Sequence, residues 1–270
     1  MKSRFSLRLA LLGMIALACA FAPGDAGAQQ GASPASAAGS APATPKAVFE
    51  LFTSQGCASC PPADTLLSEL ATDPQVIALT LAVDYWDYVG WKDTLAKHGH
   101  SVRQRAYAEQ RGDRMIYTPQ MVVDGFAPAK GSDKVAVEKA LARAHDAGTM
   151  LVVPVSLSRS GQTLTVNVAA GPSGSGAVHI PNAAEVWLCP IVSSHTVAIG
   201  RGENQGKSVT YTNVVRAWVK LGNWTGEAAR FQVPLSEVWS EGVDGAAVLV
   251  QRGSFQAPGP ILGAAKIDLK

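Results

Sequence analysis

Two cysteines separated by two residues, Cys57 and Cys60, are the side chains of this sequence best suited to chemistry. They follow an apolar run at residues 47–52 and open a stretch, residues 57–71, with the periodicity of a helix. The first turn of a helix carries free backbone N–H groups and the positive end of the helix dipole, and both favour a thiolate. In dithiol–disulfide chemistry one thiolate attacks and a second cysteine resolves the mixed disulfide. We therefore expect Cys57, at the helix cap, to be the more exposed attacker and Cys60, within the first turn, to resolve.

The segments that must position these cysteines alternate between strand and helix patterns, in the order strand, helix, strand, helix, strand, strand, helix. The second strand is a near-continuous apolar run, as expected for a buried parallel strand. Pro119 opens a later short strand, and a final helix begins near Ser132 and closes at Gly148. The expected strands include residues 48–53, 76–83 and 120–124, and the expected helices are residues 57–71, 94–111 and 132–148.

This order of elements, with the CxxC at a helix start and Thr118-Pro119 downstream, resembles the thioredoxin fold. The resemblance runs from about residue 46 to residue 148. In thioredoxin-like proteins a cis-proline faces the CxxC across the site, and the resemblance gives that place to Pro119. It implies that Cys57 and Cys60 are the redox-active pair. It also implies that the backbone of Thr118 orients an incoming peptide, which adds as a short strand.

The whole chain also resembles an uncharacterised family of secreted bacterial thioredoxin-like proteins, known as a domain of unknown function. The resemblance supports the fold and names no substrate. Four stretches carry it: Gly-Cys-x-x-Cys-Pro-Pro-Ala-Asp from Gly56, Val-Asp-Tyr-Trp-Asp-Tyr from Val83, Tyr-Thr-Pro-Gln-Met-Val-Val from Tyr117 and Arg-Gly-Glu-Asn from Arg201.

The sequence pattern changes after residue 150. Short segments in which apolar and polar residues alternate recur there, separated by Gly, Asn and Pro turns, as in antiparallel sandwiches. We therefore expect an α/β thioredoxin-like domain at residues 46–149, followed by an all-β antiparallel sandwich-like domain at residues 150–270. The expected strands of the second domain are residues 152–157, 164–169, 184–189, 196–199, 214–220, 229–233, 246–251 and 261–267.

Residues 1–28 have the form of an export signal, with a basic start, a short apolar stretch and a small-x-small cleavage site. The alternative is a lipoprotein modified at Cys19, although the large Leu17 fits that motif poorly. Residues 29–45 are rich in Ala, Ser, Gly and Pro and are expected to form a flexible linker. The protein is thus expected to be periplasmic or secreted, in an oxidising compartment where a CxxC can be oxidised.

Without residues 1–28 the chain holds 20 Lys and Arg residues against 20 Asp and Glu residues, down from 23 and 21. A neutral chain without a basic run gives no electrostatic reason to bind nucleic acid. Beyond the export signal, no segment has the length and apolar character of a membrane span. Cys189 makes the cysteine count of the exported chain odd, which predicts one free thiol. We interpret Cys189 as a buried apolar residue or, alternatively, as a relay thiol for the CxxC.

An unusual segment at residues 84–93 interleaves aromatic and acidic side chains. The carboxyl ends of parallel strands share one edge of a sheet, so this segment is expected to border the CxxC. We expect Trp91 to belong to a peptide-binding rim and Trp86 to pack under the domain interface. Thioredoxins bury an acid on the strand before the motif, but Glu50 is one residue too far away. Glu50 is therefore expected at an edge or surface.

The remaining polar clusters have structural interpretations. Arg201 is expected to pair with Glu203, although Arg201 or Arg216 could instead reach the first domain or a substrate carboxylate. His98 and His100 are interpreted as part of a solvated helix, and no residue is assigned as a metal ligand.

Together these features predict an exported thiol–disulfide oxidoreductase that exchanges its CxxC with protein or peptide thiols. Thr118, Pro119 and Trp91 are the expected substrate-binding residues. No cofactor is needed, but an external redox partner must reset the dithiol. Two alternatives stay open: a periplasmic protein that handles Cu(I) through its soft thiolates, and a non-catalytic binding module whose CxxC disulfide is structural.

Overall fold

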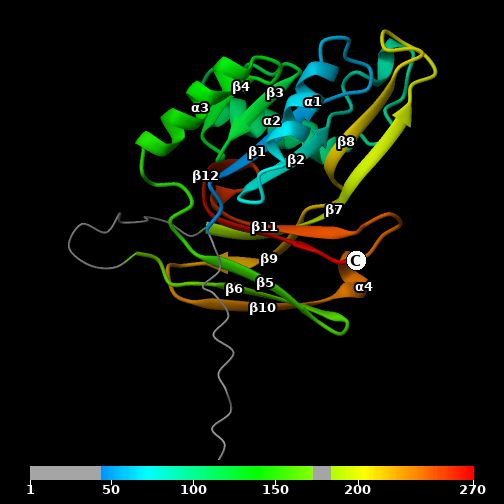
Figure 1. The fold of residues 1–270 in the computed structure, drawn as a ribbon. Helices are drawn as coiled ribbons and strands as arrows, with labels where there is room; N and C mark the ends of the chain where they lie inside the picture. The colour runs from blue at the N-terminus through cyan, green and yellow to red at the C-terminus, as the bar shows by residue number, and fades with distance from the viewer. Residues whose placement is uncertain (1–43, 173–183) are drawn as a thin grey trace, which may run out of the picture. The chain divides into compact units, whose positions relative to one another are not determined.

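The computed structural model describes residues 44–172 and 184–270. Over these residues the chain is a mixed α/β structure with few helices and a large, mostly antiparallel sheet region (Figure 1). The expected export signal, Cys19 and the linker as far as residue 43 lie outside the described residues. Within the two described ranges, no helix is long and apolar enough to cross a membrane.

The first half of the described chain follows the expected order of strands and helices. Its first strand is buried along its whole length, as the apolar run before the cysteines indicates. Its elements are β1 (Ala47–Thr53), α1 (Pro61–Leu70), β2 (Val76–Ala82), the short 3₁₀ helix η1 (Asp87–Val89), α2 (His98–Arg111), β3 (Gln120–Val123), β4 (Ala127–Lys130) and α3 (Lys134–Asp146).

Helices α1 and α2 each begin about one turn later than the sequence pattern predicts. Helix α1 begins at Pro61, because a proline has no amide hydrogen and suits the first helical position, where that donor is free anyway. Helix α2 begins at His98, because the residues before it form a separate turn. In that turn the carboxylate of Asp93 accepts the amide hydrogens of Leu95 and Ala96.

Strand β1 is central to this half. It pairs in parallel with β2 and antiparallel with β3, and β3 pairs antiparallel with β4. Side chains alternate along a strand, so β1 contributes to a core on each of its faces. Phe49 and Leu51 pack with residues of α1 and α3 on one face. Val48 and Phe52 pack on the other face with residues of α2, β7, β11 and β12.

The second half is nearly all strand. The expected strands at residues 184–189 and 196–199 are one continuous strand, because β8 pairs with its distal part and holds that backbone extended. The elements are β5 (Val155–Ser160), β6 (Thr163–Val168), β7 (Ala184–Ala198), β8 (Ser208–Val215), β9 (Val219–Trp224), β10 (Ala229–Pro234), α4 (Leu235–Val238), β11 (Gly245–Ser254) and β12 (Ala257–Asp268).

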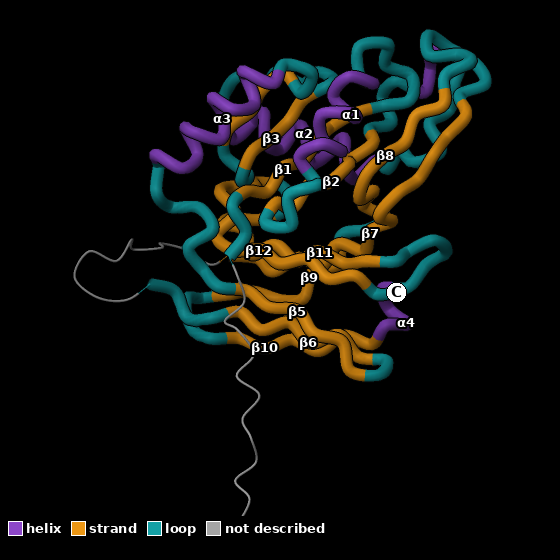
Figure 2. The backbone as a smooth tube through the Cα atoms, viewed as in Figure 1, coloured by secondary structure: helices purple, strands orange, loops and turns teal. Residues whose placement is uncertain are grey.

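Strands β5, β6 and β10 form a separate three-stranded sheet. Figure 2 shows these three strands as a layer beside β9, β11 and β12. Apolar side chains of both layers meet in one core, which includes Val166 of β6, Val186 of β7 and Val248 of β11. This core is distinct from the two that flank β1.

Strands β7 and β8 carry the larger sheet from one half of the chain to the other. β7 pairs with β11 along its first part and with β8 along its second, and β8 pairs in parallel with β2. The strand order is β12-β11-β7-β8-β2-β1-β3-β4. In Figure 1 these two strands are drawn in yellow, and β8 lies alongside α1. The expected domain boundary between residues 149 and 150 falls in the connection between α3 and β5, and the larger sheet extends on both sides of it.

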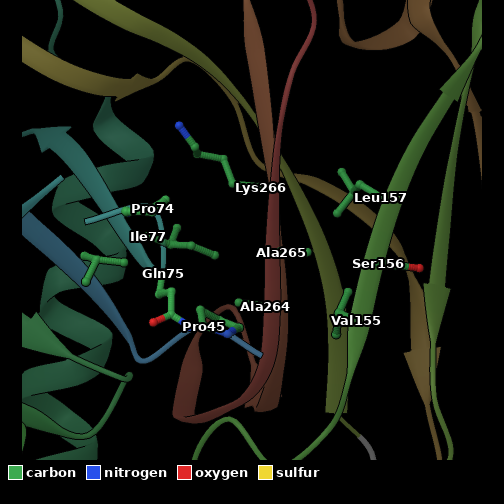
Figure 3. A pocket seen from close by; sticks show the side chains of 11 residues that line it. Pro45, Pro74, Gln75, Ile77, Val155, Ser156, Leu157, Ala264, Ala265 and Lys266 are labelled. Atoms are coloured by element: carbon green, nitrogen blue, oxygen red, sulfur yellow. The ribbon is translucent and has the colours of Figure 1, made fainter. Parts of the chain in front are cut away.

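A hollow of about 270 Å³ lies where β2, β5 and β12 approach one another (Figure 3). Its wall is largely apolar, with Ile77, Val155 and Leu157 among the residues that line it. Lys266 is the one ionisable side chain in that described wall. This described wall holds no cysteine, so the Cys57–Cys60 pair lies outside the hollow.

Candidate active site

Cys57 and Cys60 are joined by a disulfide, and their Cα atoms are 5.4 Å apart. The bond lies in the segment that connects the end of β1 to the start of α1, with Cys60 at the N-cap of the helix. Cys57 is 1% exposed and Cys60 is 0% exposed, whereas Ala58 and Ser59 between them are exposed. The two cysteines are therefore almost equally buried, which contradicts the expectation of a clearly more exposed Cys57, because residues distant in the sequence cover this segment.

Backbone hydrogen bonds shape the cysteine segment. The amide of Cys57 donates to the carbonyl oxygen of Ser54 (3.2 Å), and the amide of Cys60 donates to that of Cys57 (3.1 Å). The carbonyl oxygen of Cys60 then accepts the amides of Ala63 and Asp64, which are the first bonds of α1. Both sulfur atoms therefore belong to the N-terminal end of a helix, where backbone dipoles favour negative charge.

Gln55, two residues before Cys57, joins the cysteine segment to residues 84–93. Its backbone amide donates to Oδ2 of Asp93 (2.8 Å), and its side-chain oxygen accepts the indole N–H of Trp91 (2.7 Å). The structure therefore brings Trp91, an expected substrate-binding residue, to the CxxC through Gln55. Trp91 is half-buried and keeps part of its surface accessible.

Thr118 and Pro119, the other expected substrate-binding residues, lie at the same end of β1. The bond between them is cis, as expected. Pro119 precedes β3, which pairs with β1. Pro119 also lies close to α1, because a Cβ atom built on Gly131 would be 3.2 Å from Pro119 and 3.3 Å from Ala63. The indole N–H of Trp86 donates to the hydroxyl of Thr118 (2.7 Å), so Trp86 belongs to the site as well.

Asn204 reaches the cysteine segment from the second half of the chain, and the sequence analysis missed it. Its side-chain amide donates to the carbonyl oxygens of Gln55 (2.9 Å) and Cys57 (2.8 Å), and the residue is 1% exposed. Its neighbours Arg201 and Glu203 are exposed, and no ion pair between them occurs among the described residues. Asn204 belongs to the Arg-Gly-Glu-Asn stretch that supports the family resemblance, but roles were expected only for the charged residues of that stretch.

Asp64 is a buried acid on α1, one helical turn after Cys60. It is 3% exposed, and neither carboxylate oxygen has a hydrogen-bond partner within the described part of the chain. Burial raises the pKa of Asp64 to about 8, because an ionised carboxylate loses its hydration there. Near neutral pH the group is therefore mostly protonated and places little negative charge behind the disulfide.

Replacing Asp64 by Asn is expected to flatten the dependence of stability on pH. The pKa of Asp64 is higher in the folded chain than in the unfolded one, so stability falls as the pH rises from about 4 to about 8. Between pH 5 and pH 8 the unmodified chain should lose at least about 1.4 kcal/mol more than Asp64→Asn, the equivalent of one pKa unit.

Urea unfolding at both pH values measures this difference. Asp73→Asn is the control, because hydrogen bonds from the Gln75 amide and Lys46 lower the pKa of this exposed acid instead of raising it. Equal pH slopes for the unmodified chain and Asp64→Asn would contradict the burial argument.

Glu50 requires a second correction, because it is 0% exposed and not at a surface. One carboxylate oxygen accepts Nε–H of Arg103 (2.7 Å), and the other accepts the hydroxyl of Tyr107 (2.5 Å). The guanidinium also donates to the side-chain oxygen of Gln251 (2.8 Å) and lies 4.1 Å from the ring centroid of Trp218. The face of β1 that carries Glu50 is covered by α2 and β11. The carboxylate of Glu50 is therefore paired with an arginine and is not hydrated.

Three further residues can be placed. Cys189 is 0% exposed and free, which confirms the buried interpretation, and burial raises the pKa of its thiol. His98 is exposed, but His100 is 1% exposed, with Nδ1 2.9 Å from the carbonyl oxygen of Ala82. Burial lowers the pKa of His100 to about 4, so the expectation of a solvated histidine is wrong there. Within residues 44–172 and 184–270, no group of three or more His, Cys, Asp or Glu residues has a metal-binding arrangement.

Comparisons with known proteins place the chain in a family. Residues 48–251 match the model of a family described as Protein of unknown function (DUF1223). The crystal structure of a protein from Agrobacterium tumefaciens is similar, with a TM-score of 0.73 and 32% identity, over 84% of this chain and 96% of that chain. HBP35 of Porphyromonas gingivalis shares the fold, with a TM-score of 0.56 and 14% identity, over 83% of this chain and 74% of that chain. A search of curated proteins found no match.

Proposed function

The chain belongs to the DUF1223 family, and we propose that it is an exported thiol–disulfide oxidoreductase acting on protein or peptide thiols. One observation carries this proposal: a disulfide between cysteines two residues apart stands at the N-terminal end of α1, directly after the central strand β1. That position stabilises the thiolate, which is both the nucleophile and the leaving group of disulfide exchange.

The finer fold is part of the same proposal. A thioredoxin-like domain at residues 46–149 is supported by the parallel β1–β2 pair, the antiparallel β3–β4 pair, and helices on both faces of β1. A sandwich-like domain at residues 150–270 is supported by the apolar core shared by the two sheet layers. The export signal proposed at residues 1–28 would deliver the protein to a compartment where disulfides persist.

The proposed exchange proceeds in two steps. A substrate thiolate attacks Sγ of Cys57, the bond to Cys60 breaks, and Cys60 leaves as a thiolate that takes up a proton. A second substrate thiolate then attacks the substrate sulfur of the mixed disulfide and releases Cys57. The substrate loses two electrons and two protons, and the protein gains them. An external thiol–disulfide partner must then reoxidise the dithiol, and the same steps in reverse reduce a substrate disulfide.

Thr118, Pro119 and Trp91 are proposed to hold the substrate chain beside the cysteines. Trp91 contacts Gln55 of the segment that carries the disulfide, and Thr118 and Pro119 lie at the end of β1 from which that segment leaves. Thr118 and Trp91 are only half-buried. The backbone of Thr118 lies just before β3, which pairs with β1, and an extended backbone segment at that position can align a peptide.

A redox titration of the chain from residue 29 onward, with Cys189→Ala, tests the proposed function. The protein is equilibrated in glutathione buffers, and the fraction of reduced Cys57–Cys60 is measured. We expect a reduction potential between about −120 and −270 mV, the range from oxidants and isomerases to thioredoxin-type reductases. A disulfide that resists reduction below about −300 mV would identify a structural bridge and overturn the proposal.

A further inference from the structure

The loop between β7 and β8, residues 199–207, lies against the cysteine segment although about 150 residues separate them in sequence. Backbone hydrogen bonds close the base of this loop. The Ile199 amide donates to the carbonyl oxygen of Lys207 (2.9 Å), and the Gly206 amide donates to that of Ile199 (2.9 Å). We call residues 199–207 the covering loop. It is a hydrogen-bonded turn at the end of the paired strands β7 and β8.

Asn204 joins the covering loop to the disulfide. Its side-chain nitrogen donates to the carbonyl oxygens of Gln55 and Cys57, at 2.9 and 2.8 Å. Its side-chain oxygen accepts a hydrogen bond from the ammonium group of Lys207 (2.8 Å), which fixes the orientation of the amide. Both hydrogens and the oxygen of this buried amide are therefore used. An Asn in this setting holds the backbone of Cys57 in one position.

In a second contact, the covering loop packs against the side chain of Trp91. A Cβ atom built on Gly200 would lie 3.2 Å from the ring of Trp91, so the loop backbone packs directly against this ring. Trp91 in turn donates its indole N–H to Gln55. The loop thus contacts the cysteine segment directly, through Asn204, and indirectly, through Trp91 and Gln55.

We infer that Asn204 is a positioning residue that holds the covering loop over the Cys57–Cys60 disulfide, and that a thiol reaches Cys57 when this contact opens. The inference follows from a disulfide whose cysteines are 1% and 0% exposed and whose segment is bound by a remote loop. The role of this opening in catalysis rests on the proposed function, because only an exchanging disulfide needs access to a substrate thiol. A peptide that displaces Asn204 would gain two carbonyl acceptors beside the reacting sulfur.

Loss of the two Asn204 hydrogen bonds should make the disulfide react faster with a small dithiol. When opening is fast and reversible, the observed rate is proportional to the open population. Asn204→Ala and the near-isosteric Asn204→Asp, which cannot donate, should therefore be reduced by dithiothreitol at least about fivefold faster than the unmodified chain, as two weak hydrogen bonds predict.

The experiment measures the rate of disulfide reduction in the oxidised chain at several low urea concentrations, together with the urea unfolding midpoint. Asn223→Ala is the matched control, because Asn223 is exposed on β9, outside the covering loop. We expect the Asn204 variants to be reduced faster than both the unmodified chain and Asn223→Ala. This difference should persist when the rates are compared at urea concentrations that give all the proteins the same free energy of unfolding. Reduction at the unmodified rate, or a difference that vanishes in that comparison, would overturn the inference.

This test is separate from the test of the proposed function. Dithiothreitol reports access to the disulfide whether or not the chain exchanges with protein thiols. A reduction potential below about −300 mV together with faster reduction of the Asn204 variants would reject the oxidoreductase and retain the role of Asn204. A reduction potential between about −120 and −270 mV together with unchanged reduction rates would retain the oxidoreductase and reject the role of Asn204.

Discussion

Replacing Arg103 by Met is expected to lower the free energy of unfolding by about 3–5 kcal/mol, the usual cost of leaving a buried charge without its partner. Both side chains of the Arg103–Glu50 pair are 0% exposed. Without the guanidinium, the carboxylate of Glu50 would keep only the hydroxyl of Tyr107 as a hydrogen-bond donor among its described contacts. Gln251 and the ring of Trp218 would also lose their contacts with the cation. Urea unfolding at pH 7 measures the loss.

The exposed pair of Lys46 and Asp73 provides the matched control. Their side chains are 57% and 40% exposed, so Lys46→Met should change stability by no more than about 1 kcal/mol. The double variant Arg103→Met with Glu50→Leu removes both charges and should recover a large part of the loss. If Arg103→Met is no less stable than Lys46→Met, the buried pair does not hold β1 against α2 and β11.

Replacing Cys57 by Ser is expected to abolish thiol–disulfide exchange, with a loss of at least about a thousandfold in rate, because the residue that forms the mixed disulfide is gone. At about 1.4 kcal/mol for each factor of ten, this is a loss of about 4 kcal/mol in transition-state stabilisation. The measurement is the oxidation of a reduced dithiol peptide by the oxidised chain, with the glutathione buffer as the regenerating couple.

Cys60→Ser gives a complementary result. In the reducing direction the Cys57 thiolate can still attack a substrate disulfide and release one substrate thiolate. Without Cys60 no neighbouring thiol resolves the resulting mixed disulfide, so this complex with an oxidised peptide should accumulate and be visible by mass. Cys189→Ala should keep full activity, because Cys189 is buried and burial raises the pKa of its thiol. Full exchange activity in Cys57→Ser would falsify the assignment of Cys57 as the exchanging thiol.

The sequence was informative where interactions are local. The apolar run of β1 is a buried strand, and the cysteines stand at the N-terminus of α1. Strand periodicity and helix starts depend on neighbours within a few residues, so sequence patterns report them. The same patterns misplaced the first turns of α1 and α2, where the cysteine segment and the carboxylate of Asp93 form separate turns.

The sequence by itself determined the pair of cysteines and the elements that flank it. Only the tertiary structure decided what surrounds that pair, because the partners are remote in the chain. Glu50 meets Arg103 across 53 residues, and Cys57 meets Asn204 across 147 residues. Whether a side chain is buried depends on which distant part of the chain covers it. The periodicity of apolar residues within one segment does not reveal that distant part. For this reason Glu50, expected at an edge or surface, and Cys57, expected to be the more exposed cysteine, both lie inside the protein.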